Sequence, residues 1–243
     1  MPRRPSSRYG AVEVAHLWRP VDEIGGDFLY YEQIANQFLS LEIGDVMGHG
    51  THAGLVMTAL HGLLFGLRQQ VVALDKMLAN ANEFLWRLQQ LQTRQNPDQS
   101  FRPLLCSMFL LRVDLKNRTL AYSNAGHPSA LYLPSDLDAE ILWLESGGPI
   151  LGALPTATYQ ASHLRPVAGD TVLLFTDGLS ELKSDAGEEF GTNRLEALVR
   201  EFQTSKPRDI VEQIQQRLSE FCGTAVAADD VAVAVLQFGK KWL

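Results

Sequence analysis

Aspartates beside glycine turns, at the ends of predicted strands, are the residues whose placement most directly suggests chemistry. An apolar segment, 38–43, leads into Asp45, and glycines flank this aspartate on both sides. A strand holds such a carboxylate on a rigid element, while the glycines let a ligand or backbone approach without a Cβ clash. This geometry suits a metal ion or a phosphate. The segment alone equally fits an ordinary strand-to-helix turn with an exposed aspartate.

The same arrangement recurs elsewhere in the chain. Asp27, Asp177 and the pair Asp229-Asp230 also lie beside turns at strand edges. No cysteine accompanies them and no nearby histidine has zinc spacing, so carboxylate and carbonyl oxygens favour Mg²⁺ or Mn²⁺ over Zn²⁺. Clustered aspartates without a cation would repel and raise one another's pKa. Either they lie far apart or a metal neutralises them, and the chemistry favours a metal.

The elements that must position these acids are readable from hydrophobic periodicity. Segments 12–18 and 38–45 are predicted strands that could pair as neighbours through the turn at 35–37, bringing Asp27 close to Asp45. From residue 105 the apolar period is two, which predicts antiparallel sheet. The further predicted strands are 108–114, 119–123, 130–133, 140–145, 159–164, 171–175 and 231–238.

Helices are predicted at 51–67, 75–91, 194–202 and 207–221 from apolar residues at helical spacing. The first of these helices also carries Gly54, Thr58, Gly62 and Gly66 at every fourth position. Each interior glycine costs about 1 kcal/mol relative to alanine, so we expect another backbone to approach closely there. Tight packing on a sheet is the plainer explanation, and a helix that shifts during regulation is the sharper one.

Composition excludes several classes of protein. The chain has 243 residues, 46% of them hydrophobic, enough for one large domain or two small ones. No window of about 18 consecutive apolar residues is present and the basic start, 1–8, lacks a signal-peptide core, so we expect a cytoplasmic protein without a membrane span. The net charge of −7 argues against nucleic-acid binding. Cys106 and Cys222 fit neither a disulfide framework nor a zinc site.

Six motifs in order resemble those of one known family, the metal-dependent (type 2C) protein phosphatases, in the branch of bacterial stress-response and sporulation serine phosphatases. The resemblance runs from about residue 12 to residue 238, and six motifs in sequence are far more specific than any one. The motifs are Gly25-Gly26-Asp27-Phe28, Gly44-Asp45-Val46-Met47-Gly48-His49-Gly50, Asn124-Ala125-Gly126-His127-Pro128, Phe175-Thr176-Asp177-Gly178-Leu179-Ser180-Glu181, Phe190-Gly191 and Asp229-Asp230-Val231.

This resemblance implies an α+β fold, an α-β-β-α sandwich of two antiparallel sheets flanked by helices. We expect a flexible N-terminal segment at 1–11, a single phosphatase domain at 12–239 and a C-terminal tail at 240–243. The predicted strands and helices agree with that architecture.

The resemblance also implies two Mn²⁺ or Mg²⁺ ions at one edge of the sheets. By motif match, Asp45 bridges both ions, and Asp27 with the Val46 carbonyl helps to hold one. Asp177 and Asp229 hold the other, with Asp230 the less favoured member of its pair. A metal-bridging water would then attack a phosphoserine or phosphothreonine in line.

Departures from the eukaryotic branch leave the proton donor open. Met47 stands where that branch has a histidine, so His49, two residues on, or metal-bound water must protonate the leaving group, with water slightly favoured. Asp22 lies where that branch has its phosphate-binding arginine, and Arg19 is a weak substitute. We expect His127 to shape a turn rather than to touch substrate.

The expected function is therefore a protein serine/threonine phosphatase in signal transduction or stress response, acting on a phosphorylated protein such as an anti-sigma-factor antagonist. Regulation is expected from a partner protein or from a sensor domain outside this chain. A catalytically silent phosphatase-fold binding module is the alternative from another class, which the intact aspartates disfavour. A two-metal nuclease is disfavoured by the acidic pI and the absence of a basic stripe.

Overall fold

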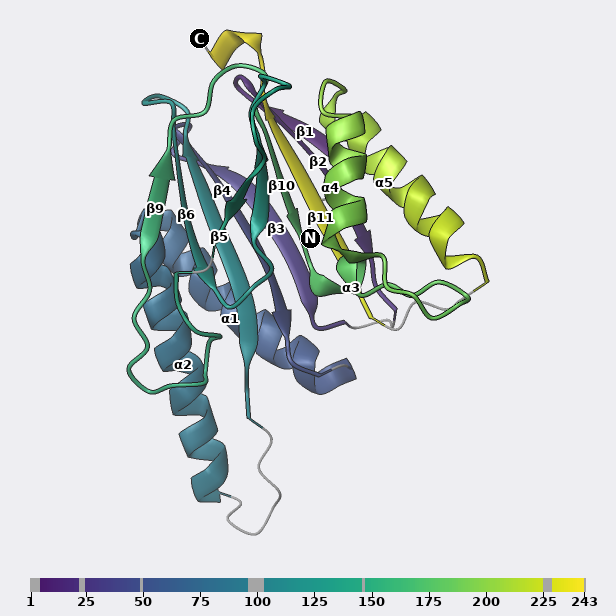
Figure 1. The fold of residues 1–243 in the computed structure, drawn as a ribbon. Helices are drawn as coiled ribbons and strands as arrows, with labels where there is room; N and C mark the ends of the chain where they lie inside the picture. Colours follow the sequence, from purple (N-terminus) through teal and green to yellow (C-terminus); the bar gives the residue numbers. More distant parts are fainter. Residues whose placement is uncertain are drawn as a thin grey trace.

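Two antiparallel β-sheets packed face to face form the centre of the molecule, and helices cover the outer face of each (Figure 1). This computed structural model describes residues 5–21, 25–48, 50–95, 103–145, 147–224 and 229–242. The architecture confirms the expected α+β sandwich. All strand pairs within both sheets are antiparallel, as the period-two segments predict.

The first sheet has the strand order β1-β2-β11-β10-β7-β8, and the second has the order β3-β4-β5-β6-β9. The strands of the first sheet are β1 (Ser6–Tyr9), β2 (Val12–Arg19), β7 (Ala130–Leu133), β8 (Leu142–Leu144), β10 (Thr171–Phe175) and β11 (Val231–Phe238). Those of the second are β3 (Asp27–Ile34), β4 (Phe38–Val46), β5 (Cys106–Asp114), β6 (Thr119–Ala125) and β9 (Ala161–Leu164).

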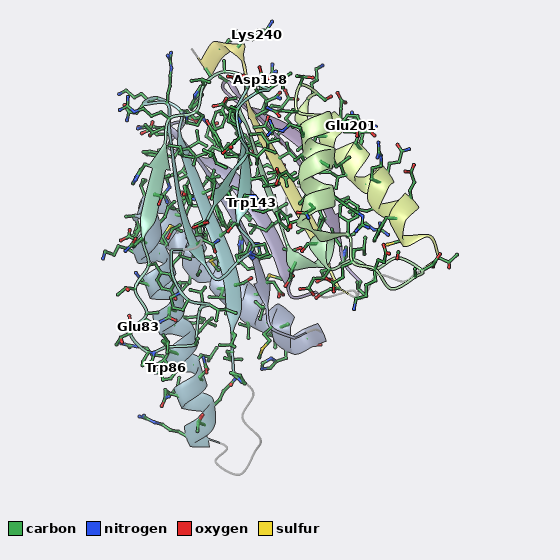
Figure 2. The ribbon with its side chains drawn as sticks, in the orientation of Figure 1. Glu83, Trp86, Asp138, Trp143, Glu201 and Lys240 are labelled. Atoms are coloured by element: carbon green, nitrogen blue, oxygen red, sulfur yellow. The ribbon has the colours of Figure 1, made fainter. Side chains whose placement is uncertain are left out.

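Helices form the two outer layers. The second sheet is covered by α1 (Gly50–Gln69) and α2 (Leu74–Gln95), and the first by α4 (Gly191–Glu201) and α5 (Pro207–Cys222), while α3 (Asp177–Ser180) and η1 (Lys240–Trp242) are short. Glu83 on α2 and Glu201 on α4 mark the outer surfaces of these layers on opposite sides of the molecule (Figure 2).

Alternate residues of the strands divide the apolar side chains among three clusters. One fills the space between the sheets and includes Leu29, Leu41, Ile43, Phe109 and Leu174. The other two lie under the helical layers. Because side chains alternate along a strand, Asp27 and Asp45 share the inter-sheet face with Leu29 and Ile43.

Three expectations need correction. Residues 12–18 pair with β1 and β11 rather than with 38–45, and the neighbour of β4 is β3, which the sequence reading missed. The segment expected to be a flexible N-terminus contains β1, which pairs along β2 from Ser6 to Tyr9. The tail at 240–243 begins with η1, whose Trp242 is buried.

At Gly62 and Gly66 the glycine stripe of α1 does not mark a close backbone approach, which is a further correction. A Cβ at Gly62 or Gly66 would meet no atom within 4 Å. The helix packs on the second sheet with its other side, through Ala53, Leu60 and Leu64. It is also long and apolar enough to cross a membrane by length and composition alone, and Leu55 and Phe65 on this helix are exposed.

Candidate metal centre

Asp27 and Asp45 are brought together by the register of two neighbouring strands. Asp27 is the first residue of β3 and is the Cα partner of Asp45 near the end of β4. Directly opposite residues of an antiparallel pair have Cβ atoms about 4.5–5.5 Å apart, so the two carboxylates are neighbours on the inter-sheet face. The predicted proximity of Asp27 and Asp45 is thus confirmed, although by a strand pair that the sequence reading did not anticipate.

Oxygen atoms converge on Gly26, immediately before β3. A Cβ at this glycine would lie 2.5 Å from the Val46 carbonyl oxygen, 2.8 Å from Asp45 Oδ1 and 3.0 Å from the Gly48 carbonyl oxygen. The Val46 amide donates to the Gly26 carbonyl at 3.1 Å, which fixes this approach. Any side chain at Gly26 would therefore fill a small cradle lined by one carboxylate and two carbonyl oxygens.

Asp177 reaches the same edge from the other sheet. It begins α3 directly after β10, and Thr176 ties this point to β11 by two hydrogen bonds with Ala232, at 3.0 Å from the Thr176 amide and 2.9 Å to its hydroxyl. A Cβ at Gly178 would collide with the Asp230 carbonyl oxygen and lie 3.5 Å from Asp229 Cβ. Glycine after Asp177 thus lets the Asp229-Asp230 segment lie directly against α3.

The two consecutive aspartates before β11 have different surroundings. Asp230 is buried, and its carboxylate accepts hydrogen bonds from the Val21 amide at 2.8 Å and the Asp27 amide at 3.4 Å. Asp229 is exposed and accepts one hydrogen bond, from the Asp230 amide at 2.8 Å. Asp230 therefore binds two main-chain amides, those of Val21 and Asp27. Asp229 is the aspartate of the pair that is exposed.

These carboxylates raise one another's pKa. Burial, the largest cause, raises the pKa of Asp27 to about 9; a hydrogen bond with Thr176 opposes this, and Asp45, Asp230 and Asp229 add to it. Burial followed by repulsion from Asp177, Asp229 and Asp230 raises the pKa of Asp45 to about 7. Burial and Asp229 raise the pKa of Asp177. No lysine or arginine contributes to these shifts among the described residues, so the described part of the edge supplies no compensating cation.

The donors fit a hard divalent cation. Asp27 Oδ2 is buried without a hydrogen-bond partner in the described part of the chain, and the cradle at Gly26 offers further oxygens. No group of three Asp, Glu, His or Cys side chains among the described residues is placed to hold an ion by itself, so carbonyl oxygens such as those of Val46 and Gly48 would have to complete the ligand set. Carboxylate and carbonyl oxygens are the ligands of Mg²⁺ and Mn²⁺.

Of the remaining predicted residues, His49 and Asp22 lie outside the described residues. Met47 is 46% exposed, and its amide donates to the Leu105 carbonyl at 2.9 Å. Arg19, the cross-strand partner of Val231, lies at the same edge with its side chain exposed.

His127 shapes a turn, as expected. Its amide donates to Asn124 Oδ1 at 2.8 Å, and Asn124 Nδ2 donates to the His127 carbonyl at 2.9 Å. Burial lowers the pKa of the ring to about 3, partly opposed by the Phe175 carbonyl. The ring is therefore neutral near pH 7, which disfavours it as the missing proton donor.

Two residues of this site, Ser107 and Thr176, were given no role of their own by the sequence. Ser107 is the Cα partner of Asp45 on β5, a placement that only the register of the predicted strands could have revealed. Thr176 directly precedes Asp177, and its hydroxyl accepts a hydrogen bond from the Ala232 amide. Threonines at strand ends often face solvent, so the residue type alone did not predict this role.

Together the two-sheet sandwich and its acidic edge define a type 2C-like serine phosphatase domain. The chain belongs to the Stage II sporulation protein E (SpoIIE) family, whose model matches residues 37–239. The SiaA-PP2C domain of Pseudomonas aeruginosa has the same fold, with a TM-score of 0.77 at 22% identity, covering 93% of this chain and 85% of that one.

Two relatives from Bacillus subtilis carry a phosphatase name. The phosphoserine phosphatase RsbP is 28% identical over 170 residues, 70% of this chain and 40% of that protein. The phosphoserine phosphatase RsbU is 24% identical over 208 residues, 86% of this chain and 58% of that protein. The chain thus spans about half the length of these curated relatives.

Proposed function

We propose that this chain is a metal-dependent protein serine/threonine phosphatase whose active centre is the acidic edge. One observation carries the proposal: Asp27 and Asp45 are paired in register on a buried face, where their pKa values rise to about 9 and about 7, with no protein cation beside them in the described residues. An enzyme that works near neutral pH needs these groups ionised, and bound divalent cations would achieve that.

The proposed ligands divide into two sets that share Asp45. Asp27 and the Val46 carbonyl would hold one ion, and Asp177 and Asp229 the other. The electrostatic interactions support Asp45 as the shared ligand, because Asp45 acts on Asp27 and Asp177 acts on Asp45, while Asp177 is not among the groups that act on Asp27. When bound, the two ions supply Lewis acids for the phosphoryl oxygens and allow water to attack at neutral pH.

The chain's own groups prepare this site in three ways. Asp230 fixes the turn before Asp27 through main-chain amides. Gly26 keeps its cradle of oxygens open. Burial of Asp27 on the inter-sheet face keeps water away from one side of the carboxylates, which strengthens their attraction to cations.

The substrate and the regulation follow from the relatives as proposals. RsbP and RsbU are named phosphoserine phosphatases, which supports a phosphoserine or phosphothreonine on a signalling protein, such as an anti-sigma-factor antagonist. Both relatives are longer than the matched region, which supports regulation by a sensor domain or a partner protein. We place the reaction in the cytoplasm, where such substrates would be found, within a single domain that also includes β1 and η1.

Hydrolysis of p-nitrophenyl phosphate and of a phosphoserine peptide with Mn²⁺ tests the proposal. Asp45→Asn should lower kcat by roughly 10²–10³-fold, because it removes charge from the centre of the site. Asp138→Asn is the matched control, since Asp138 is exposed near the end of the molecule that carries Lys240 (Figure 2). Turnover that needs no metal, or that Asp45→Asn leaves unchanged, would reject the proposal. Binding of a phosphoprotein without turnover would favour the silent module.

A further inference from the structure

Two large apolar side chains are exposed beside the acidic edge. Met47 is 46% exposed and Val21 is 44% exposed. An apolar side chain that is exposed alone on a surface is common and needs no explanation. These two differ, because each belongs to a segment whose main chain contacts a group of the proposed metal centre. Their placement therefore decides what they can contact.

Met47 lies on the same side of its strand as Asp45. Val46, at the end of β4, is the Cα partner of Cys106. The Met47 amide then donates to the Leu105 carbonyl at 2.9 Å, which continues the same register by one residue. Because side chains alternate along a strand, Met47 follows Asp45 on the inter-sheet face, while Val46 packs under the helices. Met47 is thus the next side chain outward from the proposed bridging ligand.

Val21 lies on the other side of the Asp27 turn. Its amide donates to Asp230 Oδ1 at 2.8 Å, and the Asp27 amide donates to Asp230 Oδ2 at 3.4 Å. One buried carboxylate thus holds Val21 next to the first residue of β3. On its opposite side, Asp27 pairs with Asp45. Met47 and Val21 therefore flank the proposed metal ligands on main chains that hydrogen bonds fix.

The metal centre by itself does not distinguish one phosphoprotein from another. Divalent cations would bind the phosphoryl group, which is the same in every phosphoserine. The charged groups that act on Asp27 and Asp45 are all carboxylates, so these groups would not attract acidic residues of a substrate. Discrimination among substrates therefore depends on the side chains around the centre. A methionine suits this purpose, because its flexible thioether adapts to apolar partners and its burial on binding is favourable.

We propose that Met47, together with Val21, is a specificity-determining contact that receives an apolar side chain next to the phosphoserine of the substrate protein. This inference rests on the proposed function, because the ions must hold the phosphoryl group for its neighbours to reach Met47. The occupant is thus a phosphorylated segment with apolar residues beside the phosphoserine. Neither Met47 nor Val21 takes part in the chemical step, and both determine which substrate binds.

Two phosphoserine peptides that differ only in the residues flanking the phosphoserine, leucine in one and serine in the other, test this contact with Mn²⁺. The wild type should have a kcat/KM about tenfold higher for the leucine peptide, mainly through KM. Met47→Gln, which has a similar length, should lose most of this preference, and adding Val21→Thr should remove the remainder. Met47→Leu should keep it. All of these variants should hydrolyse free phosphoserine as the wild type does.

Leu142→Gln is the matched control. Leu142 is also 46% exposed, but it lies on the edge strand β8, where its Cα partner is Tyr132 of β7. That variant should keep the preference for the leucine peptide. Thermal melts establish that each variant is folded.

A wild type without a preference for the leucine peptide, or a folded Met47→Gln protein that keeps the preference, would overturn the inference. So would an equal loss on free phosphoserine, which would place Met47 in the metal centre, or a dimer in sedimentation that Met47→Gln dissociates, which would make a second copy the occupant. In each case, metal-dependent turnover of free phosphoserine by the wild type would leave the proposed function standing. A wild type that hydrolyses neither phosphoserine nor the peptides with Mn²⁺ would reject the proposed function, and this inference with it.

Discussion

The second sheet buries carboxylates on both of its faces, and the two faces compensate them differently. On the helix-covered face, Glu42 and Arg68 are fully buried and form an ion pair, and Arg68 Nε also donates to Glu32 Oε1 at 2.8 Å. The Arg68 guanidinium carbon lies 4.4 Å from the centre of the Tyr30 ring. On the inter-sheet face, Asp27 is equally buried, but its charged neighbours are other aspartates.

This difference separates a structural charge cluster from a ligand site. Burial raises the pKa of Glu42 and Arg68 lowers it, so the protein supplies its own counterion there. The pKa of Glu42 is raised all the same, but at the acidic edge the described residues supply no counterion, and the charged neighbours of Asp27 and Asp45 add to the rise that burial causes. That the fold places an arginine against one buried carboxylate, yet gathers several carboxylates elsewhere without one, supports the proposal that the acidic edge takes its cation from outside.

Breaking the self-compensated face should have the largest effect on stability. We expect Arg68→Met to lower the free energy of unfolding by about 3–5 kcal/mol, because Glu42 is left buried and unpaired. Urea denaturation measures this. Adding Glu42→Gln to Arg68→Met should recover part of the lost free energy of unfolding, because the neutral glutamine leaves no unpaired buried charge at this position. A loss under about 1 kcal/mol in Arg68→Met would mean that this face does not depend on its own cation.

Supplying a cation to the acidic edge should stabilise the protein. At a Mn²⁺ concentration of 100 times the dissociation constant, the gain is about 2.7 kcal/mol. Thermal melts with Mn²⁺ and with EDTA measure it. Arg68→Met should respond to Mn²⁺ as the wild type does, whereas Asp45→Asn should respond much less. An equal response in Asp45→Asn would place the bound ion elsewhere.

The pH dependence of the metal-free protein should reveal the uncompensated acids. Since folding raises the pKa of Asp27 from 3.8 to about 9 and that of Asp45 from 3.8 to about 7, the folded state binds more protons than the unfolded state between these values. Stability should therefore fall as pH rises from about 4 to about 9. We expect a fall on the order of 1–3 kcal/mol, less than the full pKa shifts imply, because the ionised carboxylates can move apart in the folded protein.

Urea midpoints across that pH range, in EDTA, measure this fall. Asp27→Asn should flatten it and be more stable than the wild type near pH 8, the opposite sign to the Arg68→Met change on the other face. Saturating Mn²⁺ should reverse the slope, because protons then compete with the ion. Stability that rises with pH in EDTA would contradict the assignment of raised pKa values.

The smallest effect is expected on the outward side of α1, away from both charge clusters. Gly62→Ala should raise the free energy of unfolding by about 1 kcal/mol without changing activity, because alanine favours the helix and a Cβ there meets nothing within 4 Å. Gly66→Ala should behave alike. Lost activity with unchanged or higher stability would support a regulatory role for this side of the helix, which is one of the two explanations that the glycine spacing suggests.

Much of this arrangement was accessible from the sequence, because strand and helix periods and the aspartate motifs are local signals. Asp27 escaped correct placement because β3 was not recognised as a strand: Tyr30, Glu32 and Gln33 interrupt its apolar pattern, and two of them serve the Arg68 cluster on the outer face. The cluster itself was invisible, since Glu32 and Glu42 meet Arg68 only through the packing of α1 on the sheet.

The remaining features of the site depend on strand registers and main-chain contacts, which could not be predicted from the sequence. The pairing of Ser107 with Asp45 depends on strand alignment to a single residue, which periodicity does not fix. The distinction between Asp229 and Asp230 depends on which carboxylate meets the Val21 amide, and two adjacent identical residues carry no sequence signal for that. The glycine stripe misled because spacing shows which residues share a helix face and not what covers it.

Anomalous scattering of Mn²⁺ in crystals of this protein would locate any ions bound at the acidic edge. We expect two ions that share Asp45, one also bound by Asp27 and the Val46 carbonyl and the other by Asp177 and Asp229, while the Glu42 and Arg68 cluster binds none. Ions found away from Asp45, or an acidic edge that stays free of Mn²⁺ at saturating concentration, would contradict it.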